Sequence, residues 1–351
     1  MNASRIKTAL IRNRLVKYLY YALRPGYVKR TLKEYFRENL DYEVTPRQLS
    51  LCTRDFMHFR WKYQGGLETD FLGTQMYRKS DFVREESFAD KSRYLWRDSI
   101  QDRALWDVFL DKRVFYREFS DYLNRKWMLV NADTSGEAVA DFVAQCGGRA
   151  FAKLPVSCGG KDVFTVTRQS VDELLALAKE NDVILEEPVK QCEELYSFSG
   201  GAVNTVRIIT IVDWSGTPHV ARCVFRIGRS SADVDNFASG GMAAYIDVET
   251  GIIYSTASTK KGRQYILHPD TGKQIVGFQI PDWEKYKEFA LTLASRFPTM
   301  RYVGWDIVRL ADGRFCVIEG NKDAGVDVME SNSLYGLKPV YTELLNRSQN
   351  V

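Results

Sequence analysis

Three oxygen-bearing side chains, Asp306, Glu319 and Asn321, lie in two apolar segments between residues 302 and 321. β-Branched residues are frequent in both segments and Ala311-Asp312-Gly313 separates them, a pattern that predicts a β-hairpin. Its strands would bring two carboxylates and an amide oxygen together near the middle of a sheet. Acids among apolar neighbours are costly unless a partner neutralises them, and Mg²⁺ accepts such oxygens while it bridges substrate phosphates. The alternative is a pair of solvent-facing strand ends.

A second chemical signal is the segment 151–164, which predicts a strand, a glycine-rich turn and another strand. Lys153 lies in the first strand. The turn contributes small and basic residues, namely Ser157, Gly159, Gly160 and Lys161. Glycines let backbone N–H groups approach phosphate oxygens, and a strand lysine supplies a fixed positive charge. The spacing of a P-loop is absent, so the alternative is an ordinary hairpin turn.

The next predicted strand, 183–187, ends in Glu186 and Glu187 and is followed by Pro188 and Val189. Such a segment can present backbone groups to a flat base while a carboxylate meets ribose hydroxyls. The alternative is a polar strand end without a ligand.

A long apolar strand, predicted at 203–212, contains Asn204 and Arg207. The planar guanidinium of arginine suits phosphate or carboxylate, whereas the alternative is a buried structural ion pair. A basic strand at 222–229 is followed by a polar, glycine-rich loop suited to closing over an anionic ligand. The loop residues that we assign to substrate are Asn236, Ser239, Gly240 and Gly241.

Composition excludes several classes of protein. No run of about 18 uncharged apolar residues occurs, so no membrane-spanning helix is predicted. The first residues lack the apolar stretch of a secretory signal. The six cysteines form no CxxC pair, which argues against a zinc site or a disulfide framework and fits reduced thiols in a cytosol. Only three histidines are present, too few for us to assign histidine-based catalysis.

Charge is distributed unevenly along the chain. Residues 1–40 hold ten Lys/Arg and two Glu, a net charge of +8, whereas the whole chain carries +4. These bases alternate with apolar residues at roughly helical spacing. The pattern fits a basic amphipathic helix on an anionic membrane surface or on a partner. The alternative is a helix whose apolar stripe packs on the body of the protein.

These candidate residues need a scaffold that changes character along the chain. Residues 1–125 predict mainly helices, and from Trp127 onward short β-branched runs alternate with turns and helices. Helices are predicted at 170–180 and 282–296. Strands are predicted at 150–153, 164–166, 183–187, 203–212, 219–227 and 243–248, followed by the hairpin. The fold class is therefore α+β, with a largely antiparallel second half.

Taken in order, these motifs resemble the ATP-grasp superfamily. More narrowly, four segments resemble the sugar-transfer-associated ATP-grasp family, and the resemblance covers about residues 105–345. The segments are Val203-Asn-Thr-Val-Arg207, Asp235-Asn-Phe-Ala-Ser-Gly-Gly241, His268-Pro-Asp-Thr-Gly272 and Gly304-Trp-Asp with Ile318-Glu-Gly-Asn321. The chain departs from the family where a Pro-Gly usually follows Glu-Gly-Asn, because Asn321-Lys-Asp-Ala-Gly325 lacks the proline.

The resemblance implies a role for each matched residue. Lys112 and Lys153 would contact ATP phosphates, the segment Glu186 to Val189 would form the hinge over adenine, and Glu193 or Glu194 would reach the ribose. Asp306, Glu319 and Asn321 would hold one or two Mg²⁺ ions. Arg207, together with Lys153 and Asn204, would be catalytic, with Arg207 facing the γ-phosphate or an acyl phosphate.

The resemblance also implies a fold and a reaction. Two α+β lobes, 105–200 and 201–351, would enclose ATP, beside a helical, basic region at 1–104. A carboxylate would attack the γ-phosphorus and an amine would displace phosphate to give an amide, in surface polysaccharide or sugar/amino-acid conjugate biosynthesis. The partners would be ATP, a carboxylate and an amine, without nucleic acid. The alternatives are a kinase that phosphorylates a hydroxyl, and a non-catalytic nucleotide-binding protein at a membrane surface.

Overall fold

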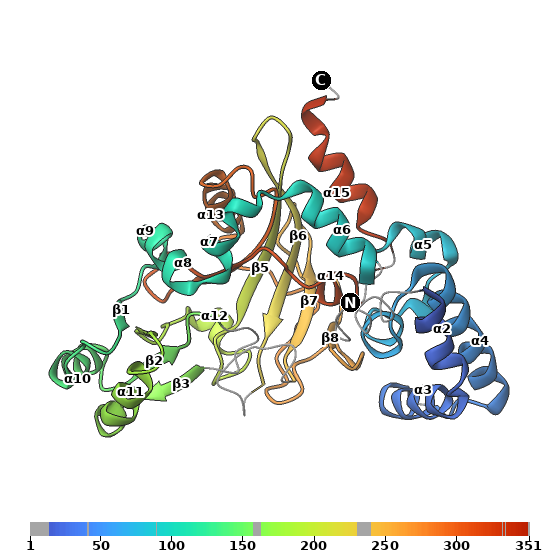
Figure 1. Ribbon diagram of the computed structural model, residues 1–351, viewed down its shortest axis with the longest axis horizontal. Coiled ribbons are helices and arrows are strands. Elements are labelled where there is room, and N and C mark those ends of the chain that lie inside the picture. The colour runs from blue at the N-terminus through green and yellow to red at the C-terminus, as the bar shows by residue number, and fades with distance from the viewer. Residues whose placement is uncertain are drawn as a thin grey trace, which may run out of the picture.

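Figure 1 shows an arched molecule with a large sheet at its centre. The computed structural model describes residues 14–40, 42–88, 90–156, 163–229, 240–331, 333 and 335–349. The strands are β1 (Trp127–Val130), β2 (Ala150–Lys153), β3 (Val163–Val166), β4 (Val183–Glu186), β5 (Thr205–Val212), β6 (Pro218–Ile227), β7 (Met242–Ile246), β8 (Ala257–Thr259), β9 (Gln264–Tyr265), β10 (Tyr302–Arg309) and β11 (Phe315–Asn321).

The helices are α2 (Arg14–Ala22), α3 (Pro25–Asn39), α4 (Pro46–Tyr63), α5 (Asp81–Glu86), α6 (Asp90–Ile100), α7 (Trp106–Leu110), α8 (Lys112–Glu118), α9 (Ser120–Leu123), α10 (Gly136–Gln145), α11 (Val171–Ala178), α12 (Glu193–Tyr196), α13 (Trp283–Ser295), α14 (Val326–Glu330) and α15 (Lys338–Leu345). Shorter helical turns are η1 (Leu67–Leu72), η2 (Met76–Arg78), η3 (Arg103–Leu105), η4 (Arg168–Ser170) and η6 (Arg347–Gln349).

The smaller sheet has four antiparallel strands in the order β1-β4-β2-β3. Helices α10 and α11 cover one of its faces, where Val139 and Leu174 pack with Leu185 in a buried core. Each such aliphatic side chain contributes about 1.5–3 kcal/mol when fully buried. Because side chains alternate along a strand, this packing directs Lys153 and Glu186 to the opposite face.

The larger sheet has seven antiparallel strands in the order β11-β10-β5-β6-β7-β8-β9. The predicted hairpin is present as β10 and β11, and its turn contains Gly313 at φ +85°. The expectation that the hairpin lies near the middle of the sheet is wrong. β11 is an edge strand, and helices α7 and α9 pack beside it.

The two faces of the large sheet are covered by different helices. On one face α13 and the α7–α9 segment pack against residues such as Ile208 and Trp305. On the other face α6, α14 and α15 pack against residues such as Ile209 and Tyr302. Alternation places Arg207 and Asp306 on this second face, which therefore combines an apolar core with charged residues.

The helical N-terminal region has a core of its own, in which Leu32 of α3 packs with Phe56 and Phe59 of α4. Helix α6 instead packs on the large sheet, and the side-chain amide of Gln101 donates to the carbonyls of Tyr302 and Lys322 at 2.6 and 3.0 Å. In Figure 1, α6 lies across the sheet between α7 and α15. Among the described residues, no helix is long and apolar enough to cross a membrane.

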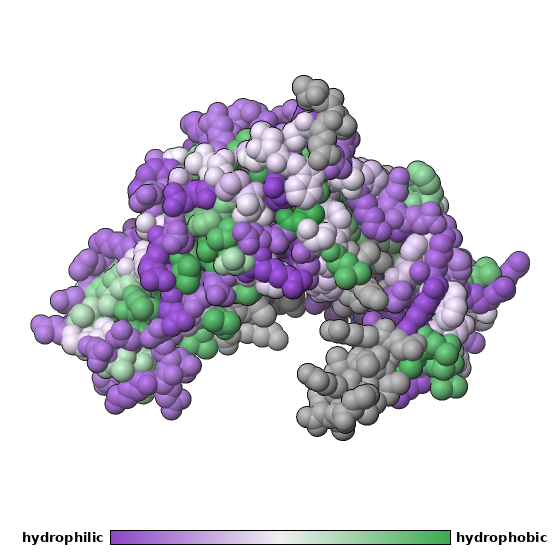
Figure 2. All heavy atoms as spheres, turned by 45° about the horizontal axis from the view of Figure 1, so that its top comes forward, coloured by the Kyte–Doolittle hydropathy of each residue, from purple (hydrophilic) through white to green (hydrophobic). Residues whose placement is uncertain are grey.

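The predicted α+β class, the helical first part and the antiparallel second half are confirmed. The sequence did not predict α10 or the short strands β8 and β9. On the face in Figure 2, hydrophobic residues form small separate patches among mostly hydrophilic ones. The three-part domain division stays a prediction.

Candidate active site

Asp306 is the buried centre of the site, with a side chain 2% exposed. It lies opposite Arg207 of β5 and Glu319 of β11. Arg207 donates from Nε to Oδ1 and from Nη2 to Oδ2, both at 2.6 Å. Arg226 of β6 donates from Nη1 to Oδ2 at 2.5 Å. One carboxylate therefore bonds two guanidinium groups.

The two guanidinium groups decide the charge of Asp306. Burial alone would raise the pKa of this carboxyl, but attraction to Arg207 and Arg226 outweighs burial and holds the pKa below its ordinary value. Asp306 is therefore ionised at neutral pH. The buried ion pair, which was the alternative for Arg207, is present, yet a carboxylate offers about four acceptor positions and can take a further partner.

Glu319 is more open than Asp306, with a side chain 42% exposed. Its Oε1 accepts a hydrogen bond from Asn321 Nδ2 at 2.9 Å and lies 3.6 Å from Arg207 Nη2. A change of register after Asp306 marks a bulge in the hairpin, a feature that re-aims side chains. The alternative of solvent-facing strand ends thus describes Glu319 in part but does not describe Asp306.

The donor set fits a hard divalent cation. Asp306 and Glu319 are direct cross-strand neighbours, and Asn321 follows two residues after Glu319 on the same face of β11. Carboxylate and amide oxygens are the ligands that Mg²⁺ takes, usually together with water and substrate phosphates. Among the described residues, no three His, Cys, Asp or Glu side chains cluster as metal ligands, so two carboxylates would need oxygens from Asn321 and substrate.

Lys112 shares a cavity with these oxygen donors. The cavity has a volume of about 170 Å³, and its lining includes Lys112, Tyr116, Glu319 and Asn321. The backbone N–H of Lys112 donates to the carbonyl of Pro155 at 2.9 Å, which ties the start of α8 to the chain that follows β2. Helix α8 therefore positions a lysine beside the predicted metal ligands.

A second charged cluster lies on the smaller sheet around Glu186. The carboxylate of this buried residue pairs with Lys153, accepts a hydrogen bond from the Tyr116 hydroxyl and accepts from Arg125 Nη2 at 2.8 Å. Arg125 also donates to the carbonyl of Val317 on β11 at 3.0 Å. The cluster therefore links the small sheet to the strand that carries Glu319.

Opposite charges keep this cluster ionised although it is buried. Burial would raise the pKa of Glu186, but Arg125 and Lys153 outweigh burial and lower the pKa to about 2. Burial would lower the pKa of Lys153, but the charge of Glu186 outweighs burial and raises the pKa. Two cations for one carboxylate leave a net positive charge, which suits phosphate.

Asn204 lies apart from both clusters and is completely buried. Its Nδ2 donates to the carbonyl of Leu195 and to Ser199 Oγ at 2.8 and 3.2 Å. Its Oδ1 accepts from the N–H of Gly228 at 2.9 Å. These bonds fix the chain around α12 and the end of β6, and the catalytic role of Asn204 stays a prediction.

The predicted adenine and ribose residues lie around α12 and the end of β4. The backbone N–H of Glu187 donates to the carbonyl of Lys126, and its Oε2 accepts from the N–H of Lys126 at 3.1 Å. Val189 is half-buried. Glu193 and Glu194 are exposed at the start of α12, so both are open to a ligand. Their roles stay predictions.

Several predicted residues fall outside the described part of the chain. They are Ser157, Gly159, Gly160 and Lys161 of the glycine-rich turn, and Asn236 and Ser239 of the substrate loop. Gly240 and Gly241 precede β7, and Gly240 has φ +99°, a value that favours glycine.

Sequence reasoning missed Arg226, Arg125 and Tyr116. Arg226 had a usable signal, because it lies in the predicted basic strand and period-2 alternation places it on one face with Arg222. Arg125 lies between a helix and a strand, and Tyr116 is one of several aromatic residues in this part of the chain, so neither had a local signal.

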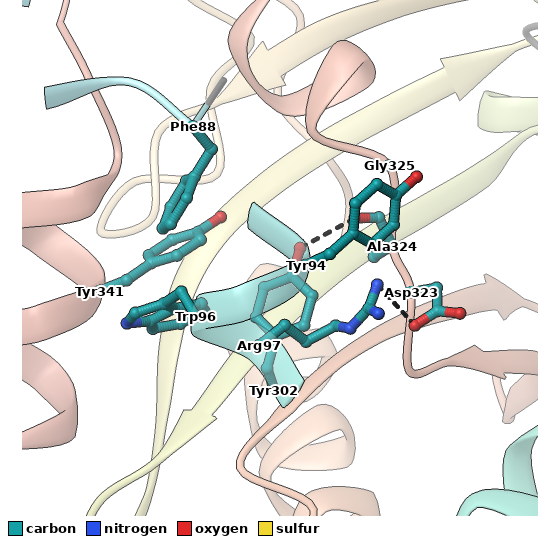
Figure 3. Close-up of a pocket in the computed structure, with 9 residues that line it drawn as sticks. All are labelled: Phe88, Tyr94, Trp96, Arg97, Tyr302, Asp323, Ala324, Gly325 and Tyr341. Atoms are coloured by element: carbon teal, nitrogen blue, oxygen red, sulfur yellow. Dashed lines mark hydrogen bonds and ion pairs between the residues drawn. The ribbon is translucent and has the colours of Figure 1, made fainter. Parts of the chain in front are cut away.

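An aromatic pocket of about 130 Å³ lies beside the segment that follows Asn321. Figure 3 shows side chains of α6 on one side and the segment Asp323–Gly325 on the other. Arg97 pairs with Asp323 at 2.7 Å, and the Tyr302 hydroxyl donates to the carbonyl of Ala324 at 3.0 Å. The remaining lining residues are Phe88, Tyr94, Trp96 and Tyr341.

Glycine at position 304 permits this arrangement. A Cβ on Gly304 would lie 2.5 Å from Ala324 Cβ and 2.9 Å from Ile209 Cδ1, closer than real contacts allow. The chain after the predicted metal ligands can therefore pack directly on β10. This close packing explains the glycine of the Gly-Trp-Asp motif in physical terms.

Comparison with solved structures finds similar folds at low sequence identity. An ATP-grasp ligase, PsnB, complexed with a phosphomimetic variant of its minimal precursor, Mg and ADP, is 16% identical over 73% of this chain, with a TM-score of 0.44. D-cycloserine synthetase DcsG is 17% identical over 71% of this chain and 73% of its own, with a TM-score of 0.43. D-alanyl-alanine synthetase A from Vibrio cholerae O1 biovar eltor str. N16961 is 13% identical over 70% of this chain and 66% of its own, with a TM-score of 0.42.

At these values the structural likeness carries no argument about function. The match covers 66% of the PsnB chain in one complex and 65% in another, just under two thirds. A comparison with curated proteins finds no match. A family model described as sugar-transfer associated ATP-grasp matches residues 152–344, more than half of the chain. The chain therefore belongs to the sugar-transfer-associated ATP-grasp family.

Proposed function

We propose that the protein is an ATP-dependent ligase that activates a carboxylate as an acyl phosphate and joins it to an amine. The observation that carries this proposal is the cluster of Arg207, Asp306 and Glu319 on one face of the large sheet. It combines oxygen ligands for a cation with a guanidinium group beside them, the two components that phosphoryl transfer needs most. Membership of the ATP-grasp family supports ATP as the phosphoryl donor.

In this proposal ATP lies between the two sheets. Lys112 and Lys153 neutralise its phosphates, because one shares a cavity with Glu319 and the other belongs to a cluster with net positive charge. The segment from Glu186 to Val189 contacts adenine, and Glu193 or Glu194 meets the ribose. Mg²⁺, one or two ions, would be held by Asp306, Glu319 and Asn321 and would supply charge neutralisation at the β- and γ-phosphates.

The chain's own residues then position and stabilise the reacting groups. Arg207 keeps one bond to Asp306 and turns its remaining donors toward the γ-phosphoryl group or the acyl phosphate. The carboxylate of the substrate attacks the γ-phosphorus and ADP leaves. The amine attacks the acyl carbon, phosphate leaves with the bonding electrons, and the amine loses its proton to solvent.

The biological setting that we propose is biosynthesis of a surface polysaccharide or of a sugar/amino-acid conjugate, and its only support is the family's association with sugar transfer.

Peripheral membrane contact is part of the same proposal. Helix α2 exposes Leu15, Leu19 and Tyr20 close to basic residues, a composition suited to an anionic surface. Sedimentation of the whole protein with anionic vesicles checks this contact, and no binding at low salt would exclude it.

The reaction is tested with Mg²⁺-ATP, hydroxylamine and a panel of amino acids and uronic acids. We expect ADP release that depends on the carboxylate, together with a hydroxamate formed from the trapped acyl phosphate. Glu319→Gln should lower the yield of both products by roughly a hundredfold or more. Glu284→Gln on the exposed end of α13 serves as the matched control.

ADP release with a phosphorylated hydroxyl product and no hydroxamate would replace the ligase proposal by the kinase alternative. Absence of Mg²⁺-ATP binding in calorimetry would reject both enzymes, since each requires nucleotide in this site.

A further inference from the structure

Arg222 is a buried guanidinium group without a carboxylate partner among the described residues. It lies in β6 and is only 4% exposed. Within the described part of the chain, no Asp or Glu forms an ion pair with it, and its Nε has no hydrogen-bond partner. A buried charge without a counter-charge is strongly unfavourable, so this arrangement points to an anion that the protein is built to receive.

Neutral groups occupy the remaining donors of Arg222. Its Nη1 donates to the hydroxyls of Tyr254 and Tyr335 at 2.9 and 2.8 Å, and its Nη2 makes a long 3.5 Å contact with the carbonyl of Met329. The guanidinium carbon lies 3.8 Å from the ring centre of Tyr245. Tyr254 and Tyr335 are 48% and 47% exposed, so each ring can rotate away and release one donor of Nη1.

A second cation reaches the same place from the N-terminal helical region. Lys79 Nζ donates to the carbonyl of Glu330 at 3.0 Å, and the neighbouring carbonyl of Met329 contacts Arg222. The two cations therefore meet at the end of α14. The pKa of Lys79 is lowered to about 8, chiefly by burial, which the charge of Glu330 opposes and the charges of Arg222 and Arg84 reinforce.

Glu330, whose backbone carbonyl Lys79 contacts, does not balance these charges. Glu330 is fully buried, and its Oε1 accepts from the backbone N–H groups of Phe88 and Leu337 at 3.2 and 3.1 Å. Its Oε2 has no hydrogen-bond partner among the described residues, and burial raises the pKa of Glu330 while the charge of Lys79 opposes that shift. Even when Glu330 is ionised, one acid faces two cations, so the cluster holds more positive than negative charge.

The cluster lies on the same sheet face as the proposed reaction centre. Arg222, Val224 and Arg226 alternate along β6, so both arginines point to the face that carries Asp306. Arg226 bonds Asp306 directly. Asp306 pairs with Arg207, which in turn pairs with Val224, so Asp306 lies two strands across and two residues along from Arg222. Two strand spacings and two residues of strand together separate Arg222 from Asp306 by roughly 12 Å.

We propose that Arg222 and Lys79 form a second anion site, which binds a carboxylate or phosphate group of the substrate at roughly 12 Å from the proposed cation site at Asp306. The identification of the anion as part of the substrate rests on the proposed ligase function, whereas the existence of an anion site does not. The substrate is then an elongated molecule with an anionic group far from the new bond. Lys79 lies outside the matched family segment, so the N-terminal region contributes to substrate choice.

The competing explanation is that Arg222 only braces the tyrosines around it. The two explanations differ in what the tyrosine hydroxyls do. In a brace they are the intended partners of Arg222, and removing them loosens the fold without changing anion affinity. In an anion site the tyrosine hydroxyls accept hydrogen bonds from Arg222 only until the anion binds. Removal of these hydroxyls therefore leaves the Arg222 donors more accessible to the anion.

Calorimetry with inorganic phosphate and, separately, glutarate tests the site, with chloride at matched ionic strength as the blank. Mg²⁺ and a non-hydrolysable ATP analogue are present, so that phosphate cannot occupy the nucleotide site. We expect Arg222→Gln to weaken binding roughly tenfold or more, because charge-assisted hydrogen bonds are lost, and Lys79→Gln to weaken it less. Arg314→Gln, on the exposed hairpin turn, is the matched control and should bind as the parent does.

A second variant keeps the test decisive if Arg222→Gln fails to fold. The pair Tyr254→Phe and Tyr335→Phe removes both hydroxyls while it keeps the rings, and we expect phosphate or glutarate to bind more tightly than to the parent. Binding of only one anion identifies the class of the group. No binding of either anion to the parent, or equal affinity in Arg222→Gln, would overturn the inference.

Failure of the proposed function has a different signature. If the ATP analogue does not bind, the ligase proposal is rejected. The titration of nucleotide-free protein, compared between the parent and Arg222→Gln, then still decides the anion site.

Discussion

Arg207 and Asp306 form a two-point ion pair across β5 and β10, with both N–O distances at 2.6 Å. The pair lies on neighbouring strands at directly opposed positions, so the sheet itself fixes its geometry. Arg226 shares the same carboxylate, which makes Asp306 the one acid of this buried three-residue cluster. The acid is therefore important both for folding and for the proposed cation site.

This shared carboxylate predicts that Asp306→Asn is both inactive and destabilised. Two buried guanidinium groups would lose their counter-charge, and breaking a buried pair in this way costs about 3–5 kcal/mol. Chemical denaturation measures the change in the free energy of unfolding. A variant as stable as the parent would show that water or Glu319 compensates the arginines.

Glu319→Gln should also lose activity, but it should keep the stability of the parent. The side chain is 42% exposed and its cation contact with Arg207 is 3.6 Å long, so the free energy of unfolding should change by less than about 1 kcal/mol. ADP release should nevertheless fall by roughly a hundredfold or more, because a metal-ligand charge is lost. Thermal melting and turnover measured on one preparation of the variant separate the two effects. A variant with the turnover rate of the parent would show that Glu319 has a purely structural role.

Arg207→Lys should be more damaging than Arg226→Lys. Arg207 donates two hydrogen bonds to Asp306 in a planar fork that an ammonium group cannot copy, whereas Arg226 donates to it from Nη1. We expect kcat to fall roughly tenfold further in the first variant than in the second. Steady-state kinetics of both variants check this order, and equal losses would contradict the two-point role.

The Glu186 cluster predicts a stability change in acid. Its pKa of about 2 lies below the ordinary 4.5, so the stabilisation is complete above pH 4.5 and is lost as the pH falls toward 2. The shift corresponds to roughly 3 kcal/mol at neutral pH. Unfolding followed between pH 7 and pH 2 should lose much of its acid dependence in Glu186→Gln.

Glu187→Gln is the neighbouring control for that measurement. The Glu187 carboxylate accepts from the backbone N–H of Lys126, which carries no charge, so its substitution should leave the acid dependence almost unchanged. An acid profile of Glu186→Gln that follows the parent would show that other carboxyl groups control stability at low pH.

The sequence predicted the residues that regular secondary structure positions. Asp306 and Glu319 were recognisable because period-2 alternation in a hairpin makes an acid among apolar residues conspicuous. The basic residues that pair with these and neighbouring acids were not predictable in the same way. Arg226 required the register between β5 and β6, and Arg125 required the packing of an irregular segment against β11.

Two polar residues with similar positions in the sequence also have different surroundings in the fold. Asn204 and Arg207 are polar residues at the start of the same long predicted strand, yet Asn204 bonds the chain of α12 while Arg207 bonds Asp306. Their side chains diverge because of tertiary contacts that no local pattern records. The predicted position of the hairpin failed for a related reason, since strand order in a sheet depends on connections outside the hairpin.

Gln101, just after α6, donates to backbone carbonyls on both sides of the predicted metal loop, at Tyr302 and Lys322. The segment that matches the family model begins only at residue 152. The fold of the matched segment therefore depends on residues well upstream of it. A fragment cut at the family boundary would lose the Gln101 donor to both carbonyls and would expose aromatic surface on the sheet.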